Sequence, residues 1–321
     1  MKAAVCPVHG PPEVVQVREL PAPDLTAGTV RVRVSAAAVN HPDVLLIADR
    51  YQVRVAPPFV PGSEFAGEIV ETNSPAAGFE VGDRVTGTAM YGAFAQEVVV
   101  DPAALIRIPA GVDDRAAAAF GVAHRTAYHA LRSVARIGPG DDVVVLGAGG
   151  GVGLAAVQLA TILGADVTAV ASAPEKLAVA ASYGARHLVD RCEEPLREAL
   201  RAAVPDGADA VIDPIGGESS EPAIRSMRRG GRFVTVGYAS GAIPRIPLNL
   251  VLIKGIVLQG FQFGDIEPAE FLRNERELSA LLSSGQVRPH VGAVYPLDDA
   301  VAALRLVADG RAVGKVVVDL A

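Results

Sequence analysis

VVVLGAGGGVGLAAVQLA, residues 143–160, is the stretch of sequence that decides the fold. A Val-rich run leads into a glycine cluster, which leads directly into a helical pattern. The strict G-x-G-x-x-G spacing fails, because the sixth position from Gly147 is Val152, but Gly147, Gly149 and Gly153 fit if the turn has one extra residue. Backbone amides at such a helix start attract a diphosphate, and glycine lets the phosphate approach closely. The stretch therefore predicts a nucleotide-binding turn, at Gly149, Gly150, Gly151 and Val152.

Strands and helices alternate on the C-terminal side of this turn as well. Pro174 opens one predicted helix and Gly184 follows its end, which is the usual placement of these two residue types. The predicted strands lie at residues 143–147, 166–171, 187–190, 209–213, 232–237 and 256–261, and the predicted helices at about 152–163, 174–183, 194–203, 219–229 and 268–284. This alternation, with short connections, predicts a doubly wound parallel sheet with six strands, as in a complete dinucleotide-binding fold.

The first part of the chain has a different pattern, in which short strands are broken by Pro and Gly. VRVRVSAAAV, residues 30–39, begins with alternating apolar and charged side chains, which is typical of a half-buried antiparallel strand. Further strands are predicted at 67–72, 83–87, 95–100 and 105–109. After residue 288 the pattern is β-α-β, which we expect to return to the first domain. We therefore predict a mainly β, barrel-like domain from residues 1–114 and 289–321, and a nucleotide-binding domain from residues 115–288.

The composition excludes several classes of function. With 29 Lys and Arg against 36 Asp and Glu, the net charge of −7 argues against a broad nucleic-acid-binding face. Only two cysteines are present, Cys6 and Cys192, which excludes a disulfide framework and a four-cysteine zinc lobe. The uncharged stretch 143–165 is long enough to span a membrane, but its six glycines predict a strand, a turn and a helix instead. Without an uninterrupted apolar run near the N-terminus, we expect a cytoplasmic location.

The end of the second predicted strand, at Ser172, bears on the choice of nucleotide. An acidic residue there would bind the ribose hydroxyls of NAD and repel a 2′-phosphate, and none is present at that point. Lys176 follows one helical turn later and Arg191 lies just after the third strand, so a hydroxyl and two cations are available for a phosphate. The alternative is that both cations are ordinary solvated surface charges, and Glu175 lies nearby. The pattern favours NADPH.

Beyond the glycine turn, the chain resembles the medium-chain dehydrogenase/reductase superfamily over essentially its whole length. The resemblance is carried, in the expected order, by VNHPDVLLIADRY (39–51), PFVPGSEFAGEIV (58–70), VGDRV (81–85), TAYHAL (126–131), the glycine turn, ADVTAVAS (165–172) and LDDAVAALRLVADGRAVGKVVV (297–318). It implies a Rossmann domain with a parallel sheet of six strands, together with a mainly β GroES-like barrel domain.

The alcohol dehydrogenases of this superfamily hold a catalytic zinc ion with a Cys, a His and a second Cys. The positions that correspond to these ligands here are Asn40, Ser63 and Val122, none of which is a good zinc ligand. His41 is a stray candidate, but a single His without partners is far more often structural. We therefore expect no metal. The resemblance is to the zinc-independent quinone oxidoreductase branch, whose members typically reduce quinones or activated alkenes with NADPH.

The resemblance implies an NADPH:quinone oxidoreductase. Quinones and α,β-unsaturated carbonyls accept a hydride without a metal, because conjugation spreads the incoming charge onto oxygen. Two alternatives are an alkenal or enone reductase and an enoyl-thioester reductase. The second arises because GAFAQEVVVDPAALIRIP (92–109) resembles the enoyl-reductase modules of polyketide synthases. A further alternative is a nucleotide-binding protein with little turnover.

The resemblance also implies roles for individual residues. Asn40 is expected to donate a hydrogen bond to the substrate oxygen or to the cofactor ribose. Tyr51 is expected either to donate a proton or to form an aromatic wall, and simple packing is as plausible; Asp43 is expected to orient the loop. Thr126 is expected near the nicotinamide-side phosphate. The rest of the cofactor cleft is expected to be lined by Gly237, Ser240, Phe261, Phe263 and Lys315.

Two further expectations concern His124 and the state of assembly. His124 departs from the apolar or aromatic residue expected near Thr126, and it is either a local proton donor or structural, the structural role being favoured. The apolar sixth strand, IVLQGF (256–261), is expected to pair with its twin across a two-fold axis, which would give a homodimer and remove an exposed sheet edge.

Overall fold

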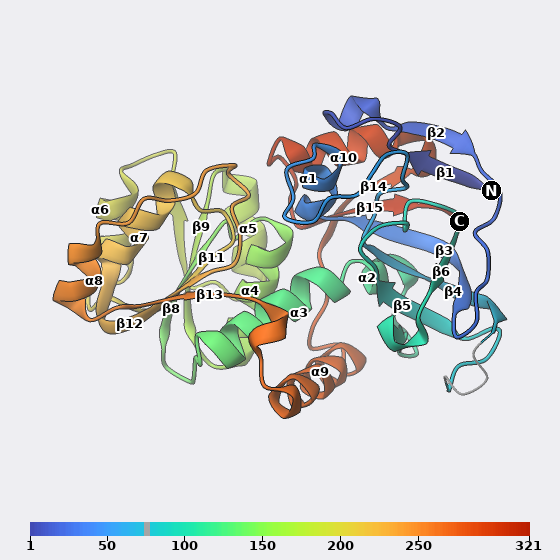
Figure 1. Cartoon of the computed structure of the whole chain (residues 1–321). Coiled ribbons are helices and arrows are strands. Elements are labelled where there is room, and N and C mark those ends of the chain that lie inside the picture. Colours follow the sequence, from blue (N-terminus) through green and yellow to red (C-terminus); the bar gives the residue numbers. More distant parts are fainter. Residues whose placement is uncertain (74–77) are drawn as a thin grey trace. The chain divides into compact units, whose positions relative to one another are not determined.

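In the computed structural model, which describes residues 1–73 and 78–321, the chain divides into two compact units (Figure 1). Unit 1 consists of Met1–Val122 and Arg288–Ala321, and unit 2 consists of Ala123–Val287. The first boundary falls inside helix α3 (Gly121–His129), later in the chain than residue 114. The reason is that α2 (Asp114–Ala118) packs on strands of unit 1.

Unit 2 contains a parallel sheet of six strands in the order β10-β9-β8-β11-β12-β13. The strands are β8 (Asp142–Leu146), β9 (Asp166–Ala171), β10 (His187–Asp190), β11 (Ala208–Asp213), β12 (Met227–Thr235) and β13 (Val257–Gly260). The strand order reverses between β8 and β11, and at such a point the carboxyl ends of the strands open to a ligand. The predicted doubly wound sheet is confirmed.

Helices connect these strands and supply the packing on the sheet. They are α4 (Gly151–Ile162), α5 (Pro174–Ser182), α6 (Leu196–Ala203), α7 (Ser220–Ser226), α8 (Leu248–Lys254) and α9 (Pro268–Ser283). Helices α4 and α5 contact each other and the strands that flank them, and α6 and α7 form a second contacting pair. Side chains of α6 and α7 share one apolar core with Val144, Leu146 and Val211 of the sheet.

One predicted helix boundary in unit 2 is wrong. The helix predicted at 219–229 ends at Ser226, and β12 begins at Met227 instead of residue 232. Gly230 has a φ of 74°, which a helix does not accommodate, and the β11–β12 register shifts over this stretch. The polar sequence MRRGG therefore enters the sheet as an irregular strand start, which the apolar periodicity did not reveal.

Unit 1 is built on a sheet of seven strands. Its order is β14-β15-β3-β4-β5-β7, and β6 pairs with β3; all of these pairs are antiparallel except β14 with β15. The strands are β3 (Val30–Val39), β4 (Glu64–Thr72), β5 (Arg84–Thr88), β6 (Glu97–Val100), β7 (Leu105–Arg107), β14 (Val291–Pro296) and β15 (Lys315–Asp319). The mainly β character predicted for this part of the chain is confirmed, and the C-terminal β-α-β segment joins the sheet where β15 pairs with β3.

Shorter elements complete the chain. A separate hairpin pairs β1 (Lys2–Val5) with β2 (Gln16–Glu19), and unit 1 also contains α1 (His41–Ile47) and α10 (Ala300–Ala308). The remaining turns are the 3-10 helices Pro12–Val14, Pro102–Ala104, Gly217–Ser219, Phe263–Asp265 and Leu297–Asp299, and a π-helical turn, Ala130–Val134, continues α3. The sequence patterns missed α1, a seven-residue helix that Asn40 begins.

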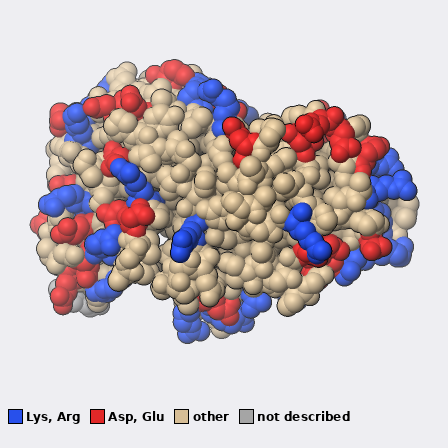
Figure 2. All heavy atoms as spheres, turned by 180° about the vertical axis from the view of Figure 1, so that it is seen from behind, with Lys and Arg blue, Asp and Glu red and all other residues tan. Residues whose placement is uncertain are grey.

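The described part of the chain contains no membrane-spanning helix, and one face of the molecule has mixed charge. No helix in residues 1–73 and 78–321 is both long and apolar enough to cross a bilayer. The face seen in Figure 2 has Lys and Arg interspersed with Asp and Glu, instead of gathered into one positive surface. That the protein lacks a broad nucleic-acid-binding face stays a prediction.

Candidate functional site

The glycine turn between β8 and α4 forms a tight cradle with no room for a Cβ at Gly149 or Gly153. Gly147 has a φ of 63°, and the Gly150 amide donates to the Gly147 carbonyl oxygen over 2.9 Å. A Cβ on Gly153 would lie 2.1 Å from the same oxygen, so only glycine lets the helix begin this close to the turn. Gly150 is the N-cap of α4, and Gly151 and Val152 are its first residues. This arrangement directs backbone amides at an anion, as the diphosphate of a dinucleotide requires.

Lys176, from the first turn of α5, packs on this cradle. A Cβ on Gly149 would lie 2.4 Å from the Lys176 Cβ, so the absent side chain leaves room for the lysine stem. Burial lowers the pKa of Lys176; the charge of Glu175 opposes this shift and that of Arg191 adds to it. The three residues predicted to select the nucleotide therefore lie close together. Ser172 follows β9, and the Arg191 amide donates to the carbonyl oxygen of the adjacent Ala171 over 3.0 Å. The charge of Arg191 in turn lowers the pKa of Lys176.

Two more loops reach the carboxyl end of the sheet, after β11 and β12. Asp213 ends β11 and is fully buried; it accepts hydrogen bonds from the amides of Ile215 and Gly216 and from the Ser220 hydroxyl, over 3.0, 2.7 and 2.6 Å. Burial raises its pKa, and these bonds lower it by less. A Cβ on Gly147 would lie only 2.7 Å from the Ile215 side chain, so the two are in close contact. Asp213 therefore fixes a loop that packs against the glycine cradle, and sequence reasoning missed it.

The predicted cofactor residues Gly237 and Ser240 lie in the loop after β12. Gly237 is close enough to Pro214 that a Cβ would approach its carbonyl oxygen to 3.3 Å, and a Cβ on Gly217 would meet the Ser240 hydroxyl at 2.7 Å. The two loops therefore pack on each other at the same edge of the sheet. Their contact with a cofactor stays a prediction.

Phe261 and Phe263, which follow β13, belong to an aromatic cluster. The Phe263 ring lies edge-on to Phe261 and to His129, with ring centroids 4.9 and 5.6 Å apart, and His129 stacks on Phe271 at 4.7 Å. The Arg125 guanidinium lies 5.6 Å from the Phe263 ring centre. Arg125 and His129 flank Thr126 on α3, and Thr126 is 9% exposed. The cluster fixes the Phe263 ring, which is 39% exposed, next to the end of the sheet.

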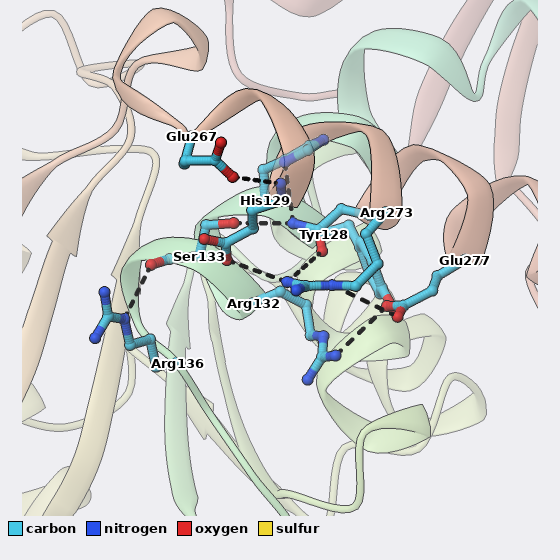
Figure 3. Close-up of polar contacts among 10 residues, drawn as sticks. Tyr128, His129, Arg132, Ser133, Arg136, Glu267, Arg273 and Glu277 are labelled. Carbon is cyan, nitrogen blue, oxygen red and sulfur yellow. Dashed lines mark hydrogen bonds and ion pairs between the residues drawn. The ribbon is translucent and has the colours of Figure 1, made fainter.

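A buried polar network joins α3 to α9, as Figure 3 shows for part of it. His129 is fully buried; its Nε2 lies 2.8 Å from a Glu275 carboxylate oxygen, and its Nδ1 lies 3.3 Å from the Asn274 Nδ2. Asn274 also donates to the Ser133 hydroxyl oxygen over 2.9 Å, and Arg125 pairs with Glu275. Burial raises the pKa of Glu275, but the bonds and charges of His129 and Arg125 lower it by more. The pKa of Glu275 therefore lies below its usual value. The network holds α9 on the helix that carries Thr126.

In unit 1 the predicted residues Asn40 and Lys315 meet at a buried carboxylate, Glu64. The Lys315 Nζ donates to the Asn40 Oδ1 over 2.6 Å and to a Glu64 oxygen over 2.9 Å, while the Asn40 Nδ2 donates to the same Glu64 oxygen over 3.0 Å. Glu64 is fully buried and Lys315 is 4% exposed. The other Glu64 oxygen accepts from the Val122 amide over 2.8 Å, at the start of α3. The sequence gives no local signal for Glu64, because Lys315 and Asn40 are distant from it along the chain.

Asp43 lies beside this network but makes different bonds. Asn40 caps α1, and its amide donates to the Asp43 Oδ2 over 2.7 Å. The Ser63 side chain also bonds to Asp43, and Gly62, with a φ of 97°, makes the turn that presents Ser63; a Cβ there would meet the Phe94 amide at 2.7 Å. The prediction that Asp43 orients the loop fits these bonds. Tyr51 is half-buried against the unit 1 core, so either of its expected roles is open.

The side chains at the zinc-ligand positions do not fit a metal ion. Asn40, Ser63 and Val122 offer an amide, a hydroxyl and an apolar side chain, and the Lys315 ammonium is bonded to Asn40. His41, the stray candidate, is partly buried and its Nε2 has no hydrogen-bond partner. His124 is 3% exposed, within α3. In the described ranges no three His, Cys, Asp or Glu side chains lie close enough to bind a metal.

The chain matches two family models. Residues 26–110 match the alcohol dehydrogenase GroES-like domain, and residues 151–280 match the model described as zinc-binding dehydrogenase. The second description names zinc, but residues 151–280 do not contain Asn40, Ser63 or Val122. The two models match unit 1 and unit 2 respectively.

Individual relatives give a narrower assignment. Quinone oxidoreductase-like protein 2 from Bos taurus is 36% identical over 99% of this chain and 92% of its own length. The quinone oxidoreductase from Thermus thermophilus, solved also in complex with NADPH, is 34% identical, with a TM-score of 0.86 over the whole of both chains. The Escherichia coli quinone oxidoreductase, solved with NADPH, is 26% identical, with a TM-score of 0.91 over the whole of both chains. The chain therefore belongs to the medium-chain dehydrogenase/reductase superfamily, in its quinone oxidoreductase branch.

Proposed function

We propose that this protein reduces quinones by hydride transfer from NADPH, without zinc. The observation that carries the proposal is the glycine turn between β8 and α4, where a Cβ on Gly153 would collide with the Gly147 carbonyl oxygen, so that α4 begins directly at the turn with its N-terminal amides. NADPH would supply the hydride. The membership in an oxidoreductase family, and the two relatives solved with NADPH, support this assignment.

The residues beyond β9 support NADPH over NADH. The charge of Arg191 lowers the pKa of Lys176, and the charge of Glu175 opposes this shift by more. A 2′-phosphate carries nearly two negative charges and would relieve the repulsion between the two cations, whereas the hydroxyl of NADH would not. The Ser172 hydroxyl is half-buried at the same strand end. We therefore propose that these three residues bind the 2′-phosphate.

The cofactor proposal is tested by separate titrations with NADPH and NADH, followed by nicotinamide fluorescence. We expect tighter binding of NADPH, and about tenfold loss of that preference in Arg191→Ala, which corresponds to about 1.4 kcal/mol. Arg201→Ala is the control, because Arg201 is also exposed but lies on α6. Equal affinity of the wild type for both nucleotides would contradict the proposal.

The buried network in unit 1 supports a reaction that needs no Lewis acid. The Lys315 ammonium and the Glu64 carboxylate balance each other, and both bond to the side-chain amide of Asn40, which stands at a zinc-ligand position of the alcohol dehydrogenases by resemblance. Without a metal to polarise it, a simple alcohol or ketone is a poor substrate, while a conjugated acceptor already spreads the incoming charge. Both hydrogens of the Asn40 amide are engaged, by Glu64 and Ala38, so we propose that Asn40 positions the loop. Restoration of activity by zinc after chelation would contradict a zinc-independent reaction.

The acceptor is tested by NADPH oxidation with 1,4-benzoquinone, a naphthoquinone, an enal and a crotonyl thioester. Faster turnover of the quinones supports the proposal. Preference for the enal or the thioester would favour the enone or enoyl-thioester reductase instead. Tight NADPH binding with no oxidation by any acceptor would favour a nucleotide-binding protein without turnover.

We further propose that the protein is a homodimer joined at β13. All four residues of this edge strand are exposed, and the neighbouring α8 exposes Leu248, Leu252 and Ile253 by 73, 82 and 61%. An exposed apolar edge strand is a site of pairing with another chain, and a twin strand would cover it. A cytoplasmic location stays a prediction from the sequence.

A further inference from the structure

The site in unit 1 contains a buried carboxyl group, Asp43, one of whose two oxygens has no hydrogen-bond partner among the described residues. Asp43 is fully buried, and its Oδ1 has no hydrogen-bond partner in the described structure. Its Oδ2 accepts from the Asn40 amide over 2.7 Å, and its carboxyl group also bonds to the Ser63 side chain. A carboxylate that leaves a buried oxygen without a donor carries a large desolvation penalty, whereas a neutral carboxyl carries much less.

The charges around Asp43 point the same way. Glu64 from β4 and Lys315 from β15 form a buried ion pair, so their charges already balance. At Asp43 these two charges oppose each other, because the Lys315 charge lowers its pKa and the Glu64 charge raises it. His41, on the same helix, offers no compensation, since burial lowers its pKa and the charge of Arg50 lowers it further. Burial raises the pKa of Asp43 to about 7, with opposing bonds from Asn40 and Ser63.

The protonation of Asp43 decides which way the Ser63 hydroxyl donates. When Asp43 is ionised, the Ser63 O–H donates inward to its carboxylate. When Asp43 is neutral, the same heavy-atom contact is made by the Asp43 O–H, and Ser63 becomes the acceptor. The Ser63 hydrogen is then released to donate to another group. Because Ser63 is half-buried whereas Asp43 is fully buried, Ser63 is the exposed end of this pair.

We propose that Ser63 donates the proton that the reduced acceptor takes up, and that Asp43 replaces it from inside the fold. This inference rests on the proposed reductase function and names its proton donor. A conjugated carbonyl takes the hydride with both electrons from the nicotinamide, and negative charge develops on the carbonyl oxygen. The Ser63 O–H bond breaks as that oxygen takes the proton, the Asp43 O–H bond breaks as Ser63 regains one, and solvent returns a proton to Asp43. The net change consumes one NADPH, one proton and one acceptor.

The first test reads the Asp43 proton without turnover. Difference infrared spectra of the wild type minus Asp43→Asn, recorded from pH 5 to pH 9, are expected to contain the C=O band of a protonated carboxyl group at low pH. The band should disappear as the pH rises through about 7. Asp49→Asn is the control, because Asp49 closely follows the same helix but is partly exposed and pairs with Arg54. A wild type without this band at pH 6 would overturn the inference.

The second test follows the proton in single-turnover reduction of a quinone. For the wild type we expect the rate to fall as the pH rises through about 7, because ionised Asp43 turns the Ser63 hydroxyl inward. Ser63→Ala and Asp43→Asn should lower the rate at pH 6 at least tenfold and abolish this pH dependence, in keeping with the usual contribution of a general acid. NADPH affinity should change less than about twofold, and Asp49→Asn should retain the wild-type rate and profile.

The outcomes separate the two proposals. A Ser63→Ala variant that keeps the wild-type rate and pH profile overturns the relay but leaves the reductase function intact. The same holds if Tyr51→Phe loses the pH-dependent limb while Ser63→Ala keeps it, because Tyr51 would then be the donor. If no acceptor is reduced by the wild type, the proposed function fails and the relay fails with it.

Discussion

At the scale of single residues, Glu64 has the largest energetic effect that the site predicts. It holds the Lys315 ammonium, the Asn40 amide and the start of α3, and none of it is exposed. Removing one partner of a buried ion pair leaves the other charge uncompensated, at a cost of about 3–5 kcal/mol. We therefore expect Glu64→Gln to lower the free energy of unfolding by about 3 kcal/mol, measured by urea denaturation.

Two further variants separate charge imbalance from general damage at Glu64. Adding Lys315→Met to Glu64→Gln removes the orphaned charge and should recover part of the lost stability. Glu71→Gln removes an acid whose side chain is 56% exposed and paired with Arg31, and should cost at most about 1 kcal/mol. A double variant that is less stable than Glu64→Gln alone would contradict this account.

Asp43 gives a second residue-scale prediction, for stability against pH. Its pKa is about 7 in the folded protein against a usual 3.8, so between these values the folded state binds more protons than the unfolded state. Stability from this group is therefore complete at low pH and is lost as the pH rises toward 7. We expect the difference between the wild type and Asp43→Asn to change by on the order of 2 kcal/mol from pH 5 to pH 8, in urea denaturation. A difference that is constant with pH would contradict it.

At the scale of elements, α9 is held by buried polar bonds in addition to the apolar contacts of Leu278 and Leu282. Asn274 is fully buried and donates to both Ser133 and His129, so Asn274→Ala leaves two buried polar atoms without this donor. Such a loss costs about 1–3 kcal/mol, which we expect to see in urea denaturation. Asn249→Ala, at an exposed position of α8, should change stability by less than about 0.5 kcal/mol. If the two variants lowered the free energy of unfolding equally, the network would not contribute to stability.

The secondary-structure elements differ in how well the sequence predicts them. The strands of the parallel sheet and helices α4 and α5 were predictable, because buried Val-rich runs and Pro or Gly punctuation are local signals. The start of β12 was not, since the polar MRRGG stretch joins the sheet only through the pairing of Met227 with Ala208 of β11. Likewise Glu64 and Lys315, 251 positions apart, meet only because β15 pairs with β3, which pairs with β4. Long-range pairing of this kind leaves no local pattern.

The residues of the candidate site also differ in how well the sequence predicts them. The glycine cradle and the residues beyond β9 lie within about two consecutive βα units, so their convergence follows from the parallel sheet alone. Asp213 was not singled out, and Ser63 was named only at a zinc-ligand position, because the bonds of a buried aspartate at a strand end and of a serine after glycine are seen only in three dimensions. Lys315 was expected among the cofactor residues, and its observed bonds are to Asn40 and Glu64.

At the scale of the whole molecule, the exposed apolar residues of β13 and α8 determine the expected assembly. Leu252 is 82% exposed on α8, and Val257 and Leu258 of β13 are 46 and 38% exposed, so solvent contacts them in a single chain. Pairing of β13 with its twin would satisfy the backbone groups of the edge and bury these side chains in one step. We expect a dimer in sedimentation velocity, and a monomer for Leu252→Asp, because a charge buried in an apolar interface without a partner is strongly unfavourable.

A matched control makes the dimer prediction specific to that edge. Leu272 is also an exposed leucine on a helix, at 59%, but it lies on α9. Leu272→Asp introduces the same charge and should leave the dimer intact, while both variants should keep the circular dichroism of the wild type. Dissociation by Leu272→Asp but not by Leu252→Asp would move the interface to α9. A monomeric wild type would instead mean that β13 and α8 remain open edges, which would leave this chain prone to self-association at high concentration.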